Sequence, residues 1–212
     1  MTKQQRALRT RTALVRAAAV EFDRDGYAGA SLAQIRDAAQ ISMGAVTFHF
    51  ATKAELADAI EGASRTMAAD VAARVMTDGP PSLHLAARFT LELTGLLERE
   101  VVVRAGARLA RERPGSPEWS SAWVPALRRM LERLHVEGSL PPSAAPDLLV
   151  ALVMCLLEGM DAALRRSRRT PNPAEPGSFV GELARFWQII FAGVNHHDCH
   201  CLCQRPERDP RS

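Results

Sequence analysis

The sequence is poor in the features that mark secreted, disulfide-bonded or membrane-spanning proteins. Its 212 residues include only four cysteines, and three of these crowd between positions 199 and 203, so they do not form a disulfide framework. The longest apolar run, residues 148–157, is far shorter than the roughly 20 residues that cross a bilayer. The beginning of the chain shows no apolar signal segment. We therefore expect a reduced, cytoplasmic protein with no membrane partner.

The body of the chain also lacks the residue sets that catalysis requires. It shows no nucleophile–base set, no phosphate-binding loop and no metal-ligand cluster, so we expect no enzyme activity, no cofactor and no bound metal. His196, His197, His200 and the three neighbouring cysteines gather near the end, but their spacing matches no structural zinc motif. We interpret residues 195–212 as a disordered tail, with a metal sensor as the alternative.

The formal net charge is only +3, which does not by itself imply a nucleic-acid partner. Its distribution is uneven, however, because five cations precede the first acidic residue, Glu21. These are Lys3, Arg6, Arg9, Arg11 and Arg16. A basic arm of this kind either solubilises the chain or contacts phosphates, and phosphate contact is the better explanation beside a DNA-reading motif.

Ala, Leu, Arg and Glu dominate the composition, which predicts an all-α protein. Hydrophobic periodicity together with Gly and Pro breaks predicts about nine helices. Two of these are short and lie within residues 31–50; the others are expected at residues 4–25, 52–76, 82–99, 101–111, 119–137, 146–166 and 178–194. Gly26 is expected to end the first of them in a left-handed conformation.

Residues 31–50 hold the pattern around which the rest is organised. Ser31 and Gln34 form a capping box for a first short helix, and Ser42 caps a second one. Ile41 lies in the turn between them and would hold the two helices at an angle. The pattern predicts a helix-turn-helix, with an ordinary helical corner as the alternative.

From Arg9 to Leu56 the chain resembles the DNA-binding domain of TetR-family transcriptional repressors. The matching residues are Thr10, Arg11, Ala17, Ala18, Phe22, Gly26, Tyr27, Ser31, Ile35, Ala38, Ala39, Ile41, Ser42, Gly44, Phe48, His49, Phe50, Lys53 and Leu56. The resemblance implies a three-helix DNA-binding domain at residues 1–50 and a larger helical domain for ligand binding and dimerisation at residues 51–194. It implies a double-stranded operator and a homodimer as partners.

The residues that we expect to contact DNA lie on the basic arm, on the helix caps and on the second helix of the motif. They are Arg9, Arg11, Ser31, Ser42, Met43, Gly44, Ala45, Thr47, His49 and Lys53. Gly44 would allow close backbone approach, and Ala45 or Thr47 could touch a thymine methyl group. Lys53 is expected to meet a phosphate.

Further along, the stretch from Val103 to Leu109, together with Trp123 and Leu131, resembles the ligand domain of the γ-butyrolactone-receptor branch. This resemblance implies a small, apolar, lactone-like ligand that is covered by Trp123. The other expected pocket residues, each of which could instead pack in the core, are Phe89, Trp119, Met130, Met154 and Leu157. Arg104 and Arg108 would either anchor something polar or pair with Glu98 and Glu112.

Three positions depart from this branch. A lysine usually stands at Met43, a tyrosine at Thr47 and a glycine at Gln40. Losing the cation removes a phosphate contact, so we predict weaker or altered operator affinity. A left-handed backbone at Gln40 would carry some strain.

The centre of the expected helix at residues 146–166, residues 148–157, is apolar on every side, so this helix needs cover on two faces. Cys155 within it is expected to be buried and inert. Together with the helix at residues 178–194 it would form a four-helix interface in a dimer, a monomeric core being the alternative.

These observations lead to the interpretation of the chain as a ligand-released repressor that binds a pseudopalindromic operator as a dimer and regulates secondary metabolism. Two alternatives remain open: a drug-responsive repressor of an efflux gene, and a ligand-binding pseudo-receptor with weakened DNA binding. The sequence identifies neither the effector nor the operator.

Overall fold

The computed structural model describes residues 2–140, 144–170 and 178–194, and within them the chain is all-helical. The described residues form nine α-helices and one 3₁₀ helix and contain no strand, which confirms the predicted fold class. The elements are α1 (Lys3–Gly29), α2 (Leu32–Ala39), α3 (Met43–His49), α4 (Lys53–Met76), α5 (Leu83–Arg99), α6 (Val101–Glu112), η1 (Trp119–Ala122), α7 (Val124–Val136), α8 (Pro146–Arg169) and α9 (Phe179–Val194). The expected disordered tail at residues 195–212 lies outside the described residues.

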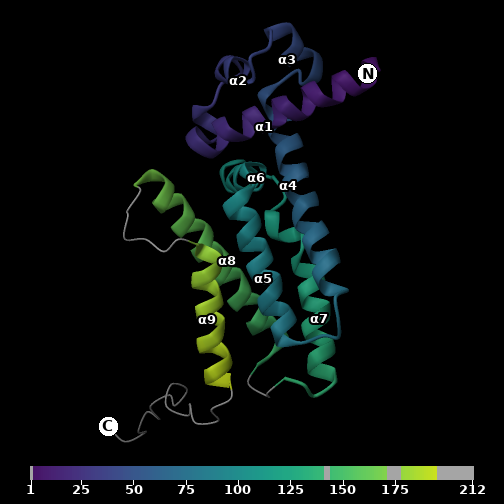
Figure 1. Cartoon of the computed structure of the whole chain (residues 1–212), viewed down its shortest axis with the longest axis vertical. Coiled ribbons are helices and arrows are strands. Elements are labelled where there is room, and N and C mark those ends of the chain that lie inside the picture. Colours follow the sequence, from purple (N-terminus) through teal and green to yellow (C-terminus); the bar gives the residue numbers. More distant parts are fainter. Residues whose placement is uncertain (1, 141–143, 171–177, 195–212) are drawn as a thin grey trace, which may run out of the picture.

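Helices α1, α2 and α3 form a head at one end of the elongated molecule, and α4 runs from this head into the helical body (Figure 1). The head has its own apolar core, in which Phe22, Ile35 and Val46 are fully buried. Leu56 of α4 and Leu109 of α6 belong to the same core. The packing of the head therefore continues past residue 50, the predicted domain boundary, into the first turns of α4.

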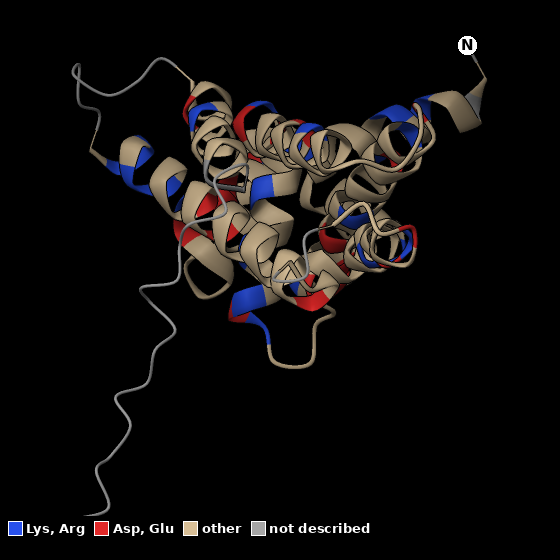
Figure 2. Ribbon diagram, turned by 90° about the horizontal axis from the view of Figure 1, so that it is seen from below, with Lys and Arg blue, Asp and Glu red and all other residues tan. Residues whose placement is uncertain are grey.

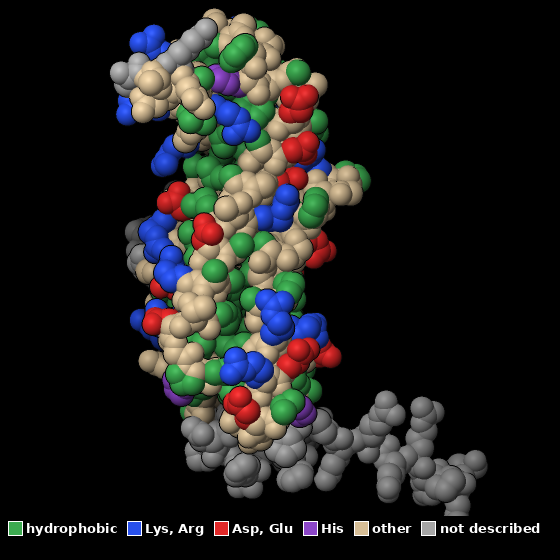
Figure 3. All heavy atoms as spheres, turned by 90° about the vertical axis from the view of Figure 1, so that its right-hand side faces the viewer, with side chains coloured by type: hydrophobic (Ala, Val, Ile, Leu, Met, Phe, Trp, Pro, Cys, Tyr) green, Lys and Arg blue, Asp and Glu red, His purple; other side chains and the backbone are tan. Residues whose placement is uncertain are grey.

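The body is built from α4 to α9 around a second apolar core. Helices α5, α7, α8 and α9 enclose Phe89, Trp123, Leu127 and Trp187, all of which are buried. The Trp187 indole N–H donates to Thr90 Oγ1 at 2.7 Å, so the polar atom of this buried ring is satisfied. On the face formed by α4 and α7, charged side chains of both signs alternate with apolar ones (Figure 3).

The expected single helix at residues 119–137 is wrong in its first part. Residues 119–122 form the 3₁₀ helix η1, and α7 begins only at Val124, with Pro125 in its first turn. Proline is favoured in a first turn because its missing N–H and its fixed φ disturb nothing there. Trp123 therefore lies at the joint between two helices, with its side chain 1% exposed.

Candidate DNA-binding surface and effector pocket

The caps of α2 and α3 are formed by the residues that the sequence pattern indicated. Ser31 Oγ accepts from the Gln34 N–H and the Gln34 side chain bonds back to the Ser31 N–H, which completes the capping box. Ser42 Oγ accepts from the Ala45 N–H. Gln40 between the helices has φ 54° and ψ 43°, the left-handed conformation that the sequence predicted to be strained. The starts of both helices are thus stabilised by hydrogen bonds between residues that are close in sequence.

The outer side of α3 is open to solvent. Gly44 and Thr47 are exposed, and Met43, Ala45 and His49 are partly exposed, while Val46 points into the head core. The Thr47 hydroxyl donates to the Met43 carbonyl at 3.1 Å, so its proton is engaged within its own helix while its oxygen can still accept a hydrogen bond. Ser31 and Ser42 are exposed as well, with their hydroxyls engaged as caps.

Phe48 is a surface residue that the sequence reasoning did not single out as a contact. Its ring is 81% exposed and stands edge-on to the His49 ring, with 5.1 Å between the ring centroids. Phe48 thus lies on the exposed side of α3 together with Gly44 and Thr47. Helical spacing could have revealed it, because Phe48 lies half a turn away from the inward-facing Val46 and Phe50.

Arg9 and Arg11 are exposed on α1 and lie toward the N-terminal end of the head. The Arg11 guanidinium lies over the Phe50 ring, 4.8 Å from its centroid, which holds this cation beside the end of α3. Lys53, by contrast, is engaged within the chain. Its ammonium donates to the carbonyls of Tyr27 and Ala30 at 2.8 and 3.0 Å and lies over the Tyr27 ring. Lys53 ties the start of α4 to the end of α1, and phosphate contact by it stays a prediction.

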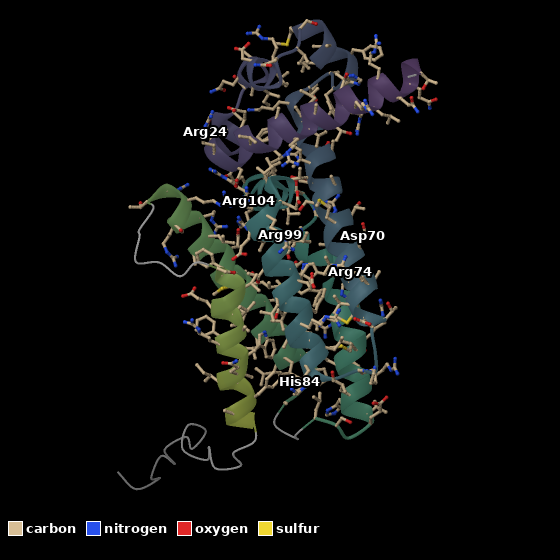
Figure 4. All side chains as sticks on the ribbon, in the orientation of Figure 1. Arg24, Asp70, Arg74, His84, Arg99 and Arg104 are labelled. Carbon is tan, nitrogen blue, oxygen red and sulfur yellow. The ribbon has the colours of Figure 1, made fainter. Side chains whose placement is uncertain are left out.

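The junction between head and body is polar and closely bonded. Arg104 on α6 is buried; its Nε donates to Asp23 of α1 at 2.9 Å and its Nη1 to the Leu97 carbonyl at 2.9 Å. Figure 4 shows Arg104 at the level where α1 crosses the body. Arg108 pairs with Glu112 at 2.6 Å, one of the pairings that the sequence suggested.

Glu112 then holds the end of α1 by accepting from the Tyr27 N–H at 2.7 Å. Burial raises the pKa of Glu112, but its bonds from Arg108 and the Tyr27 N–H outweigh that effect and set the pKa below its usual value. Helix α6 is therefore bonded to α1 at several points, and it links the head to the body alongside the long helix α4.

A cavity of about 640 Å³ opens between α6, η1 and α8. Of the predicted ligand residues, Trp119, Trp123, Met154 and Leu157 line it. Phe89 and Met130 do not; Phe89 packs edge-on against Trp123, with 5.7 Å between the ring centroids, and Met130 is buried in the core. Both aromatic walls carry a buried indole N–H, on Trp119 and on Trp123, that has no hydrogen-bond partner.

One side of this cavity is charged, which the sequence reasoning missed. Arg111, Asp161 and Arg165 line it together with Glu118 and Glu158. Asp161 and Arg165 lie one turn apart on α8, so their helical spacing offered a signal, but Arg111 joins them only through the fold. Basic residues continue along the carboxyl-terminal turns of α8 (Figure 2).

The outward side of α8 and α9 is apolar. Leu148 is 61% exposed, Ile189 69% and Phe186 41%. Cys155 on α8 is exposed, so its predicted burial is wrong for the single chain. The reason is that α8 packs only its other side against the body, as a helix that is apolar on all sides permits.

Two negative findings concern the described residues only. No helix among them is long and apolar enough to span a membrane. No group of three or more His, Cys, Asp or Glu side chains in that part of the chain is arranged to hold a metal ion, and the His- and Cys-rich cluster falls outside it.

Comparison with known proteins found a family match to part of the chain and a similar protein over most of its length. The family model described as "Bacterial regulatory proteins, tetR family" matches residues 14–60. The A-factor receptor protein of Streptomyces griseus is 28% identical over 200 residues, which is 92% of this chain and 67% of that protein.

Solved structures of similar proteins superpose on most of this chain. CprB from Streptomyces coelicolor A3(2) superposes with a TM-score of 0.71 at 29% identity, covering 89% of each chain. An ArpA-like γ-butyrolactone receptor superposes with a TM-score of 0.69 at 26% identity, covering 89% of this chain and 88% of the other. Residues 14–60 therefore resemble the tetR family of bacterial regulatory proteins, and the chain as a whole is similar to the A-factor receptor protein and to a γ-butyrolactone receptor.

Proposed function

We propose that the protein is a homodimeric transcriptional repressor that binds a pseudopalindromic operator and is released by a small γ-butyrolactone-like signal. The observation that carries the proposal is α3, a capped helix whose Gly44, Thr47 and Phe48 are exposed while Val46 anchors it to the head. A short helix held in this way fits a DNA major groove. The similar protein CprB has been solved in complex with its operator, which supports the same use of α3 here.

The apolar face of α8 and α9 supports the dimer. Leu148, Phe186 and Ile189 expose large apolar side chains on two neighbouring helices, a surface suited to a second copy of itself. Two heads on a two-fold axis would meet two half-sites about 34–36 Å apart on B-form DNA. DNA binding also sets the compartment, since an operator-binding repressor acts in the cytoplasm.

The cavity supports release by a ligand. Ala107 and Arg111 of α6 line it, while Arg104 and Arg108 of the same helix are bonded to α1. A ligand that binds better to one position of α6 than to another shifts the head by this route. Operator affinity then falls by at most the ligand's differential affinity for the two forms. We propose secondary metabolism as the regulated process because the relatives include an A-factor receptor.

A second candidate is a pseudo-receptor with weakened DNA binding. It is favoured by Met43, which offers no cation, and by Thr47, whose hydroxyl bonds to the backbone of its own helix. A drug-responsive efflux repressor, the third reading, would take a broader range of apolar ligands in the same cavity.

Electrophoretic shift of a pseudopalindromic operator by the purified protein, with and without an alkyl γ-butyrolactone, separates the candidates. A shift that the lactone reverses supports the repressor. Lactone binding without any shift at low salt favours the pseudo-receptor. A shift that varied apolar drugs reverse, while the lactone does not, favours the efflux regulator.

A further inference from the structure

One ion pair joins two walls of the cavity. Asp161 of α8 has a side chain that is only 8% exposed, and its Oδ2 lies 2.9 Å from Nη1 of Arg111 on α6. The same carboxylate oxygen also pairs with Arg165, one turn further along α8. Among the ion pairs and hydrogen bonds between described residues, the Arg111–Asp161 pair is the one that connects α6 with α8. Elsewhere α6 packs mainly against α1 and α4, and the cavity lies between α6 and α8 (Figure 1).

Helix α6 contacts the head with one side and lines the cavity with another. Arg104, Arg108 and Glu112 follow one another at four-residue spacing, and each is bonded to α1. Ala107 and Arg111, which are also four residues apart, line the cavity. A displacement of α6 relative to α8 therefore acts on the Arg111–Asp161 pair and on the bonds to the head at the same time.

Release of the operator requires such a displacement. A ligand that fills the cavity without any difference between the two forms of the protein has the same affinity for both, so it leaves operator binding unchanged. Because α6 is the proposed link from the cavity to the head, its position relative to α8 must differ between the two forms. An ion pair contributes little once its charged atoms are separated by more than about 4 Å, so a small displacement is enough to break this one.

The Arg111–Asp161 pair can open without leaving a buried charge alone. The Arg111 side chain is 47% exposed, so water can solvate its guanidinium after separation. Asp161 is the buried partner, and it keeps its contact with Arg165 on its own helix. The large penalty that follows when a buried ion loses its only partner is thereby avoided. The pair is therefore suited to opening and closing reversibly.

We propose that the Arg111–Asp161 ion pair is a latch that holds α6 beside α8 in the operator-binding form and opens when the effector is bound. The inference rests on the proposed function, since it assigns the regulation of the same cavity. Arg111 and Asp161 act through α6 and are thus positioning residues for the head. Losing a partly exposed ion pair of this kind changes the equilibrium between the two forms by about two- to fivefold.

The test measures the concentration of an alkyl γ-butyrolactone that releases half of the bound operator. The full-length protein binds a fluorescent duplex that the wild type has selected from a random-sequence pool, and anisotropy reports release. In Arg111→Gln and in Asp161→Asn the half-release concentration is expected to fall about two- to fivefold, with equal or lower operator affinity when no lactone is present. Loss of a direct contact to the lactone would raise this concentration instead.

Two controls separate the latch from other effects. Arg111→Gln and Asp161→Asn change the net charge in opposite directions, so a decrease common to both is not an effect of overall charge. Arg128→Gln is the matched variant, because Arg128 of α7 is 42% exposed, pairs with Asp147 of α8 and does not line the cavity. It removes an ion pair between two helices without touching α6, and it should keep the wild-type half-release concentration.

An unchanged or higher half-release concentration in both latch variants, or an equal decrease in Arg128→Gln, overturns the latch. In that case release of the operator from the wild type by the lactone would leave the proposed function standing. A wild type that binds the operator but is not released by the lactone would overturn both the latch and the effector half of the proposed function.

Discussion

Gly106 lies where α6 crosses α4, and replacing it with alanine probes the crossing that supports the head. A Cβ atom there would lie 2.3 Å from Ser64 Cβ and 2.6 Å from Ser64 Oγ, with the Ile60 carbonyl oxygen at 3.3 Å. Ser64 is fully buried and its hydroxyl donates to the Val103 carbonyl. The two helices must therefore separate to admit one methyl group.

The magnitude follows from two opposing terms. Overpacking of a core costs about 1–3 kcal/mol, and so deep an overlap places Gly106→Ala at the upper end. Alanine returns about 1 kcal/mol through its higher helix propensity. The net loss of about 2 kcal/mol in unfolding free energy corresponds to a midpoint about 4–8 °C lower for a chain of this size.

Thermal and urea unfolding followed by circular dichroism measure this loss. Gly62→Ala on α4 is the control, because a Cβ there meets nothing within 4 Å, and it should raise stability by about 0.5–1 kcal/mol. If Gly106→Ala were as stable as Gly62→Ala, the close α4–α6 crossing would be refuted.

Three further outcomes are expected. Met43→Lys should tighten operator binding and steepen its salt dependence by a slope of about 0.9 for each added phosphate contact, measured by fluorescence anisotropy; an unchanged slope would exclude a phosphate beside residue 43. Ile189→Glu should convert a dimer to monomers in analytical ultracentrifugation, since the charge would enter the apolar α8–α9 face, whereas a stable dimer would place the interface elsewhere. Glu112→Gln should destabilise the protein at neutral pH. The pKa of Glu112 is lower in the folded state than in the unfolded state, so its carboxylate stabilises the fold above the unfolded pKa. This stability is lost as the pH falls through the folded pKa. The difference between wild type and Glu112→Gln should therefore shrink as the pH falls below the unfolded pKa of Glu112, and a difference independent of pH would contradict it.

Local chemistry made the head predictable from the sequence. Ser31, Gln34 and Ser42 cap α2 and α3 through bonds within a few residues, so no distant contact is needed to foresee them. Gly26 has the expected positive φ of 77°, but α1 resumes after it and ends at Gly29, because the Gly26 carbonyl still accepts from the Ala30 N–H.

The wrong or missed predictions concern residues whose surroundings are formed by segments far away in the sequence. Lys53 bonds to carbonyls at the end of α1, a partnership that separations of 23 and 26 residues conceal. Arg111 reaches Asp161 only because α6 and α8 flank one cavity. Phe89 and Met130 were assigned to the pocket by their apolar character, which does not distinguish a cavity wall from a core. Cys155 was misplaced for the opposite reason, since an apolar neighbourhood in sequence does not say which side of α8 is covered.

The central claim is that two copies of α3 read one face of a duplex. Hydroxyl-radical footprinting on the operator, combined with measured stoichiometry, tests it most directly. The account predicts two chains per site and two protected half-sites about one helical turn apart, both lost on Ala45→Glu, which places a carboxylate on the outer side of α3. Protection of a single half-site by one chain, or a footprint unchanged in Ala45→Glu, would contradict it.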